Sequence, residues 1–377
     1  MSTWYNTLLT MVVLALVILF LRIALVWVLI DADWSPVTSN LKLFLVGQYP
    51  VEEMWRIGVS ALMVSLLLGV SWGVWGGVAR TFGRVTAIGL MVLVFFPLSL
   101  DDLSVEGRLW ILANPGTVGV GYLLARASFV RPKRVVLAWV VSFFLAIILL
   151  RGIGGSSVLP EVSTNLWGGL VLNLLLATVG IVASFPLGVL LALGRRSNLP
   201  AVRYLSILFI ETVRGVPLVT LLLMTQIILP LFLPEGLRID RVTRALLAIT
   251  LFSSAYMAEN IRGGLQAVPQ GQVDAAKALG LGGPHTMLFI VLPQALRAVI
   301  PAIVGQFISL FKDTSLVVIV GLLDIVNVGR SIFLGNVEWL DAQREVYVFL
   351  ALVFWVFTYS MSYASQKLEV AQGVGRR

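Results

Sequence analysis

The chain has 377 residues, of which 59% are apolar and only 12% are charged, and its mean hydropathy is +0.97. Soluble domains carry about a quarter charged residues, so this composition excludes an ordinary soluble protein and indicates an integral membrane protein. The net charge of +8 does not call for nucleic acid as a partner, because membrane proteins concentrate Lys and Arg in cytoplasmic loops. One His and no Cys argue against a metal site and exclude disulfides.

The first part of the chain, residues 1–151, is predicted to form an N-terminal extension of about five membrane spans. A spanning helix needs about 20 mostly apolar residues. The stretches that qualify are Leu8–Ile30, Ile57–Ala79, Val85–Leu100, Leu109–Ala127 and Val135–Leu150. The first run is too long for the apolar region of a signal peptide, so we expect it to be retained. Leu109–Ala127 is interrupted by Pro115 and several glycines, but removing it would place the basic residues around Arg131 outside the cell.

A Gly-, Ser- and Pro-rich stretch at residues 152–164 reads as an external linker, and five further spans follow within residues 165–377. These spans are Leu166–Leu193, Tyr204–Leu229, Val242–Ala258, Val299–Leu323 and Val346–Tyr363. The fold class predicted is therefore an all-α integral membrane protein with about ten transmembrane helices. Basic residues gather in alternate loops, at 80–84, 126–134 and 195–203, which predicts that both termini are cytoplasmic.

The connection at residues 259–297 is the most informative part of the sequence. Pro269 and Gly280 frame a short segment, and Pro favours a helix start whereas Gly favours a left-handed helix end. We expect a helix between them with a small exposed face of Ala275, Ala276 and Ala278. Such a face lets another surface approach the backbone closely, which suits docking onto a soluble partner, although an ordinary loop helix would have the same pattern.

The same segment resembles the EAA motif of ABC importer permeases, whose pattern is E-A-A-x3-G-x9-I-x-L-P. The matching residues are Asp274, Ala275, Ala276 and Gly280, followed by Ile290-Val291-Leu292-Pro293. Asp274 replaces the usual Glu, which shortens the reach of one carboxylate. The flanking runs AENIRGGLQAVPQGQ, LPQALRAVIPAI, FKDTSLV and ETVRGVPLVTLLL are similar to the polar amino acid group of these permeases, and the long N-terminal half is similar to the general L-amino acid type.

This resemblance implies a five-helix type I permease core at residues 165–377 with a cytoplasmic coupling loop at 259–297. It also implies a bacterial inner-membrane location and several partners: a second permease subunit, similar or identical, two ATPase subunits, an external substrate-binding protein, an amino acid substrate and membrane lipid. The chain has no Gly-Lys pair, so it has no phosphate-binding loop of the usual kind. The resemblance therefore implies that this chain binds no cofactor and is not an enzyme, with ATP and Mg held by the ATPase.

Ionisable residues within spans are costly and are candidate functional residues. Glu211 and Arg214 are three residues apart, so the spacing predicts that they pair; Glu259 and Arg262 repeat the spacing. Either pair could be structural or could contact substrate. A zwitterionic amino acid needs an acceptor for its ammonium group and donors for its carboxylate. The candidate pathway residues are Tyr256, Glu259, Asp313, Thr314 and Ser315, and Lys312 beside Asp313 is predicted to find an ion partner of its own.

Two other classes of function are compatible with parts of the sequence. An ion-coupled secondary transporter or channel would explain charged residues in spans, but no internal repeat is visible. An intramembrane enzyme would need a convergent set of His, carboxylates or metal ligands. One His and no Cys argue against such a site, although a carboxylate dyad stays open.

Overall fold

The computed structural model describes residues 3–76, 105–127 and 130–371, and helices dominate these ranges. The N-terminal helices are α1 (Trp4–Val26, continued by a π-helical turn to Asp31), α2 (Ser35–Thr38), α3 (Leu41–Val46), α4 (Met54–Trp75), α6 (Val105–Ala127) and α7 (Pro132–Arg151). The later helices are α8 (Gly169–Arg195), α9 (Pro200–Gly215), α10 (Leu218–Leu223), α11 (Arg241–Ala267), α12 (Gln270–Ala278), α13 (Gly283–His285), α14 (Leu292–Asp313), α15 (Ile325–Gly335) and α16 (Gln343–Ala371).

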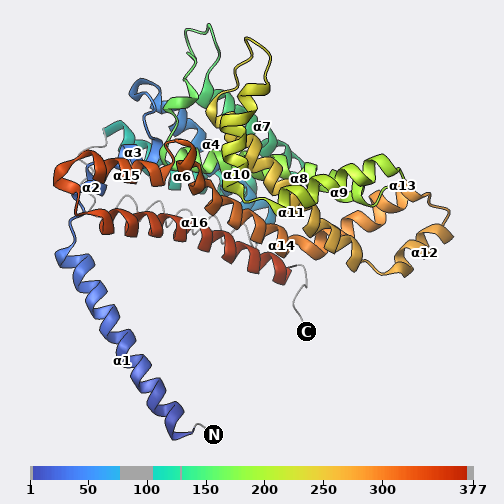
Figure 1. Cartoon of the computed structure of the whole chain (residues 1–377), viewed down its shortest axis with the longest axis horizontal. Helices are drawn as coiled ribbons and strands as arrows, with labels where there is room; N and C mark the ends of the chain where they lie inside the picture. Colours follow the sequence, from blue (N-terminus) through green and yellow to red (C-terminus); the bar gives the residue numbers. More distant parts are fainter. Residues whose placement is uncertain (1–2, 77–104, 128–129, 372–377) are drawn as a thin grey trace.

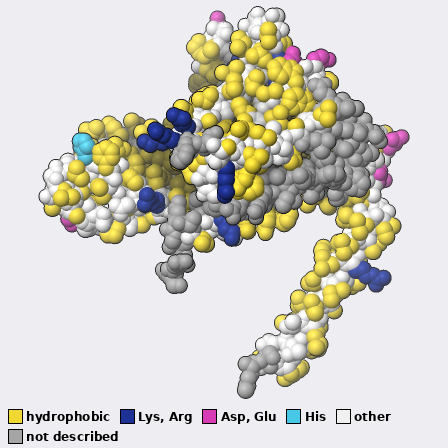
Figure 2. Space-filling model, turned by 180° about the vertical axis from the view of Figure 1, so that it is seen from behind, with side chains coloured by type: hydrophobic (Ala, Val, Ile, Leu, Met, Phe, Trp, Pro, Cys, Tyr) yellow, Lys and Arg dark blue, Asp and Glu magenta, His cyan; other side chains and the backbone are white. Residues whose placement is uncertain are grey.

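Within these ranges, six helices are long and apolar enough to cross a membrane, and a bent pair would make a seventh. The six contain α1, α4, α7, α8, α14 and α16, and the one with α14 runs from Gly283 to Val320. The predicted span at 85–100 lies outside the described residues, and α6 and α11 are long but less apolar than the six. The total of about ten spans therefore stays a prediction. Figure 2 shows hydrophobic side chains over much of the visible surface, as expected of a lipid-facing protein.

The predicted span at 204–229 is not one straight helix, and whether it crosses the membrane as one span stays a prediction. The chain bends by 105° between α9 and the helical segment that starts at Leu218. Pro217 has no N–H to donate to the preceding turn, and the residue before a proline is pushed towards extended backbone. Val216 is extended accordingly, with φ −111° and ψ 136°. The helix is therefore interrupted within this mostly apolar stretch.

Gly121 of α6 and Gly69 of α4 allow these two helices to pack closely. Helix α6 runs through Pro115 without a break. A Cβ atom on Gly121 would overlap the Leu66 carbonyl oxygen of α4, and one on Gly69 would overlap the Val118 carbonyl oxygen of α6. The two backbones thus touch along a small-residue seam, as is common between helices in membranes.

The N-terminal extension is joined to the later helices by a buried segment around α2 and α3. Phe44 is fully buried in a cluster with Ile325 of α15 and Leu350 of α16. Arg56 at the start of α4 is also fully buried, and its Nη1 donates to the Pro160 carbonyl at 2.9 Å while its Nε pairs with Glu53 at 2.7 Å. These contacts tie the extension, the 152–164 linker and the later helices together, whereas the exact domain boundaries stay predictions.

Helix α11 is the centre of the second half and packs against α8, α9, α10 and α14. A Cβ on Gly264 would lie 2.5 Å from the Ala295 carbonyl oxygen, so α11 and α14 approach to backbone contact at this point. Farther along, Gly180 of α8 faces both Ile249 and Leu310. These contacts fix an antiparallel register in which the late part of α11 meets the early part of α14. In Figure 1 this leaves α12 and α13 at one end of the molecule, while α1 stands apart from the body.

Candidate coupling helix and ion-pair cluster

Helix α12 begins and ends where Pro269 and Gly280 predict. Pro269 is its N-cap, and Gly280 adopts the left-handed conformation with φ +80° just beyond its C-cap. Gly280 N–H donates to the Lys277 carbonyl at 2.9 Å, and Leu281 N–H donates to the Ala276 carbonyl at 3.1 Å. These two bonds form a Schellman motif, which satisfies carbonyls that the helix leaves unpaired. The predicted helix between Pro269 and Gly280 is confirmed.

One face of α12 is anchored and the other is free. Helix α12 packs against the π-helical segment Thr286–Val291 that leads into α14, and Val273 belongs to the same hydrophobic cluster as Met287 and Val291. Ala276 is only 3% exposed, so the expectation that it lies on the exposed face is wrong. The reason is helical geometry, because residues three apart share a face.

The free face of α12 carries Asp274, Ala275 and Ala278, all exposed. Asp274 accepts a hydrogen bond from Gln270 Nε2 at 3.3 Å and has no ion partner among the described residues. The other motif residue, Pro293, is exposed in the first turn of α14. The exposed Lys277 balances the charge of Asp274, so the surface that remains is short, small and close to neutral, at an end of the molecule.

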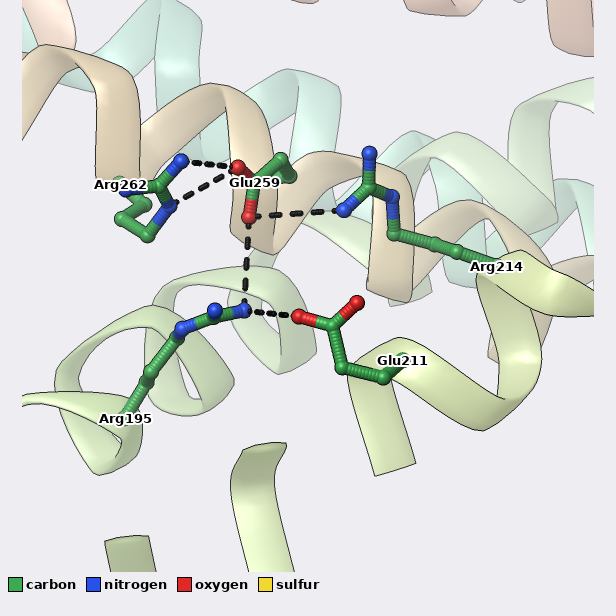
Figure 3. Close-up of polar contacts among 5 residues, drawn as sticks. All are labelled: Arg195, Glu211, Arg214, Glu259 and Arg262. Atoms are coloured by element: carbon green, nitrogen blue, oxygen red, sulfur yellow. Dashed lines mark hydrogen bonds and ion pairs between the residues drawn. The ribbon is translucent and has the colours of Figure 1, made fainter. Parts of the chain in front are cut away.

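Five charged side chains from α8, α9 and α11 form an ion-pair cluster (Figure 3): Arg195, Glu211, Arg214, Glu259 and Arg262. Arg195 Nη1 pairs with Glu211 Oε1 at 2.7 Å and lies 3.6 Å from Glu259 Oε2. Arg214 Nη1 lies 3.7 Å from the same Glu259 oxygen, and Arg262 holds the other oxygen through Nε at 2.8 Å and through Nη2. Glu259 is thus the hub, and three guanidinium groups face two carboxylates.

The predicted Glu259–Arg262 pair is confirmed, but the predicted Glu211–Arg214 pair is wrong. Glu211 pairs with Arg195 of α8, and Arg214 turns to Glu259 of α11. Both partners come from other helices, so tertiary packing overrides the three-residue spacing within α9. The cluster consequently joins three helices, whereas two local pairs would have joined none.

Tyr256 belongs to the same region. The Arg214 guanidinium carbon lies 5.6 Å from the centre of the Tyr256 ring, within cation–π range. Glu259 Oε2 is buried and accepts no hydrogen bond among the described residues, because its two arginine neighbours are too distant. The site therefore offers a cation, a carboxylate oxygen with spare acceptor capacity and an aromatic face together.

The other predicted pathway residues lie at the junction where α14 ends and a 3₁₀ helix, Thr314–Val320, begins. Thr314 is fully buried; its hydroxyl donates to the Phe311 carbonyl at 2.6 Å and accepts from Asn173 Nδ2 at 3.0 Å. It has no surface that a solute could reach, which argues against a pathway role. Ser315 donates to the Lys312 carbonyl at 2.8 Å. Lys312 is exposed, Asp313 is half-buried, and neither has an ion pair within 4 Å among the described residues.

These two sets of predicted residues are not brought together. The antiparallel register puts Glu259 towards the Gly264 end of α11, whereas Asp313 follows Leu310, which lies at the level of Ile249. Ten residues of α11 separate the two levels, which corresponds to about 15 Å at the usual helical rise. The candidates therefore form two separate groups along the helices rather than one pocket. The first group is the ion-pair cluster with Tyr256, and the second is the segment 312–315.

Sequence reasoning missed two buried polar residues near the second group. Asn173 of α8 is fully buried, and besides Thr314 it accepts the Ile325 N–H at 2.9 Å. Asp324 is also fully buried and caps α15, accepting the N–H groups of Asn327 and Val326 at 3.1 and 3.2 Å. Burial raises the pKa of Asp324 to about 6 against the opposing effect of these hydrogen bonds. An isolated polar residue in an apolar run is the signal that could have found both.

Comparison with known proteins agrees with the motif. The family model described as a binding-protein-dependent transport system inner membrane component matches residues 184–369. The chain is 38% identical over 393 aligned residues to the inner membrane amino-acid ABC transporter permease protein YhdY of Escherichia coli, with 100% of this chain and 91% of the relative covered. It is 36% identical over 348 residues to the glutamate/glutamine/aspartate/asparagine transport system permease protein BztC of Rhodobacter capsulatus, covering 90% of this chain and 78% of the relative.

Among solved structures, an amino acid ABC transporter with histidines matches at 30% identity and a TM-score of 0.49, over 54% of this chain and 92% of that one. The YhdY and BztC alignments span nearly the whole of this chain and most of each relative. This chain therefore belongs to the ABC importer permeases of the polar amino acid type, which are membrane subunits without a nucleotide site of their own.

Proposed function

We propose that this permease forms one half of the amino acid pathway of its importer and receives ATP-driven movement through α12. The family implies ATPase partners and a substrate-binding protein in general. The assembly proposed is two permeases, this chain with a similar or identical one, above two ATPase subunits that hold ATP and Mg, with the binding protein outside. The observation that carries the proposal is the small free face of α12, a helix that ends in a Schellman motif and is anchored on its other side.

The packing supports a direct mechanical route from α12 to the ion-pair cluster. Val273 couples α12 to the segment that continues into α14. Gly264 then couples α14 to α11 at backbone contact, five residues from Glu259. Closure of the ATPase subunits on ATP would move α12 as a rigid lever. Because protein interiors are close-packed, that displacement would pass to α14 and α11 and open the substrate pathway to the outside. Hydrolysis of ATP would return the pathway to its inward-open state.

In this proposal the ion-pair cluster lies beside the pathway of a zwitterionic substrate. The Glu259 side chain is 22% exposed and its carboxylate suits an ammonium group, while the partly exposed Arg214 suits a carboxylate. Asp313 and Ser315 of the second group are proposed to line the substrate pathway, as is Tyr256 beside the ion-pair cluster. The direction of transport is inward across the bacterial inner membrane, with both termini cytoplasmic and with lipid around the outer helices.

Reconstitution of the complex in sealed vesicles tests the proposal. Binding protein and labelled amino acid outside, with ATP inside, should give uptake that stops when ATP is replaced by a non-hydrolysable analogue. The alternative, an ion-coupled secondary transporter or channel, predicts uptake from this chain alone on an ion gradient without the ATPase. That second result would overturn the proposed function.

A further inference from the structure

A cleft of about 950 Å³ separates α1 from the beginning of α16, and nothing in the transport mechanism uses it. Leu19, Ile23 and Val26 of α1 and Val348 of α16 give its wall an aliphatic part. Arg22 and Arg344 line it from the two sides, together with Trp27, Tyr347 and the carboxylate of Asp31. The cleft is therefore apolar along its length, with two cations and one anion.

Arg22 has an unusual position for a cation. It is the only charged residue of α1, and Asp31, at the end of the following π-helical turn, is nine residues away, about 13 Å along the helix. None of the side chains in the apolar window of α1 is buried against the rest of the molecule, and Arg22 has no ion partner among the described residues. A cation at that depth in a bilayer is costly unless an anion meets it. No described residue of this chain supplies that anion to Arg22.

Arg344 supplies a second cation from the other wall. It lies in the first turn of α16, is exposed, and likewise has no ion partner among the described residues. Trp27 and Tyr347 add the aromatic side chains that collect at the membrane–water interface. Two arginines against one aspartate leave the cleft with a net positive charge, bordered by aliphatic walls.

We propose that this cleft binds an anionic phospholipid, with its phosphate held by Arg22 and Arg344 and its acyl chains against α1 and α16. Guanidinium groups bind phosphate through paired charge-assisted hydrogen bonds. A zwitterionic headgroup fits less well, because its ammonium group would face the same net positive charge. A partner helix fits less well too: tight helix packing in membranes uses Gly and Ala, whereas α1 presents Leu19, Ile23 and Val26 here.

The experiment uses the full-length chain purified with its partner subunits, delipidated in detergent, and native mass spectrometry with added phosphatidylglycerol or phosphatidylethanolamine. We expect tighter binding of phosphatidylglycerol to the wild type. Arg22→Gln and Arg344→Gln should each weaken it about tenfold, as expected for one lost charged hydrogen bond. Arg22→Lys should weaken it less. The matched control is Arg330→Gln, which removes an exposed arginine of α15 outside the cleft and should change nothing.

Three outcomes would overturn the proposal. The first is equal binding of the two lipids to the wild type, a result that needs no variant to fold. The second is unchanged phosphatidylglycerol binding when both arginines are replaced. The third is efficient crosslinking of an Ile23→Cys variant to another polypeptide, which would mean that protein fills the cleft; the chain has no other Cys to confuse the result.

Discussion

Replacing Gly280 with Ala should uncouple transport by disturbing the end of α12. Gly280 has φ +80°, a conformation that costs an L-residue roughly 1–2 kcal/mol. The alternative is to leave that conformation and lose the two hydrogen bonds of the Schellman motif, each worth about 1 kcal/mol. Either way, the capped form of α12 loses about 1–2 kcal/mol, or roughly a factor of 5–30 in population. ATP-driven uptake by the reconstituted complex should fall several-fold.

Two further variants isolate the cause. Gly282→Ala is the matched control, because a Cβ at either position meets no atom within 4 Å, yet Gly282 has φ −68°. Gly280→Asn adds a larger side chain, but Asn enters the left-handed region readily. Both should transport nearly as well as the wild type. The reasoning is refuted if Gly280→Ala behaves like Gly282→Ala, or if Asn at 280 is as harmful as Ala.

Three other outcomes follow from the packing and charges. Gly264→Ala should destabilise the solubilised protein by about 1–3 kcal/mol through its clash with α14, whereas the exposed neighbour change Gly263→Ala should not; equal thermal midpoints would contradict this. Asp324 has its pKa raised to about 6 from 3.8, so its stabilising protonated form is complete below about pH 4 and is lost as pH rises through 6. Asp324→Asn keeps a side-chain cap on α15 and should remove up to about 3 kcal/mol of the pH dependence of the free energy of unfolding. An unaltered profile of stability against pH in this variant would contradict the role given to Asp324. Glu259→Gln leaves three arginines without their shared partner and should cost more than Glu211→Gln, whose carboxylate is 53% exposed and worth under about 1 kcal/mol; thermal unfolding of both variants decides.

Local signals predicted the local structure of α12. Pro269 and Gly280 mark helix ends through their own backbone restrictions, which do not depend on the rest of the fold. Which face of α12 is buried was harder to predict, because the faces of an alanine-rich helix differ little in hydrophobicity. Val273 was the one apolar marker, and it lies one turn before Ala276, on the anchored face.

Residue spacing within one helix could not predict which side chains pair between helices. Glu211 and Arg214 satisfy the three-residue rule, yet their partners are on α8 and α11. Asn173 and Thr314 are 141 residues apart in sequence, so no periodic pattern connects them. The bend at Pro217 is intermediate: the proline was visible, but only the packed structure sets an angle of 105°.

Crosslinking from α12 tests the central claim, that this helix receives the ATPase. The chain has no Cys, so Ala278→Cys and Arg330→Cys each introduce a single thiol, one on the free face of α12 and one on the exposed side of α15. With a short thiol-to-amine crosslinker in native membranes, Ala278→Cys should crosslink to the ATPase subunit and Arg330→Cys should not. Absence of the ATPase from the Ala278→Cys product, or equal crosslinking from both positions, would contradict the account.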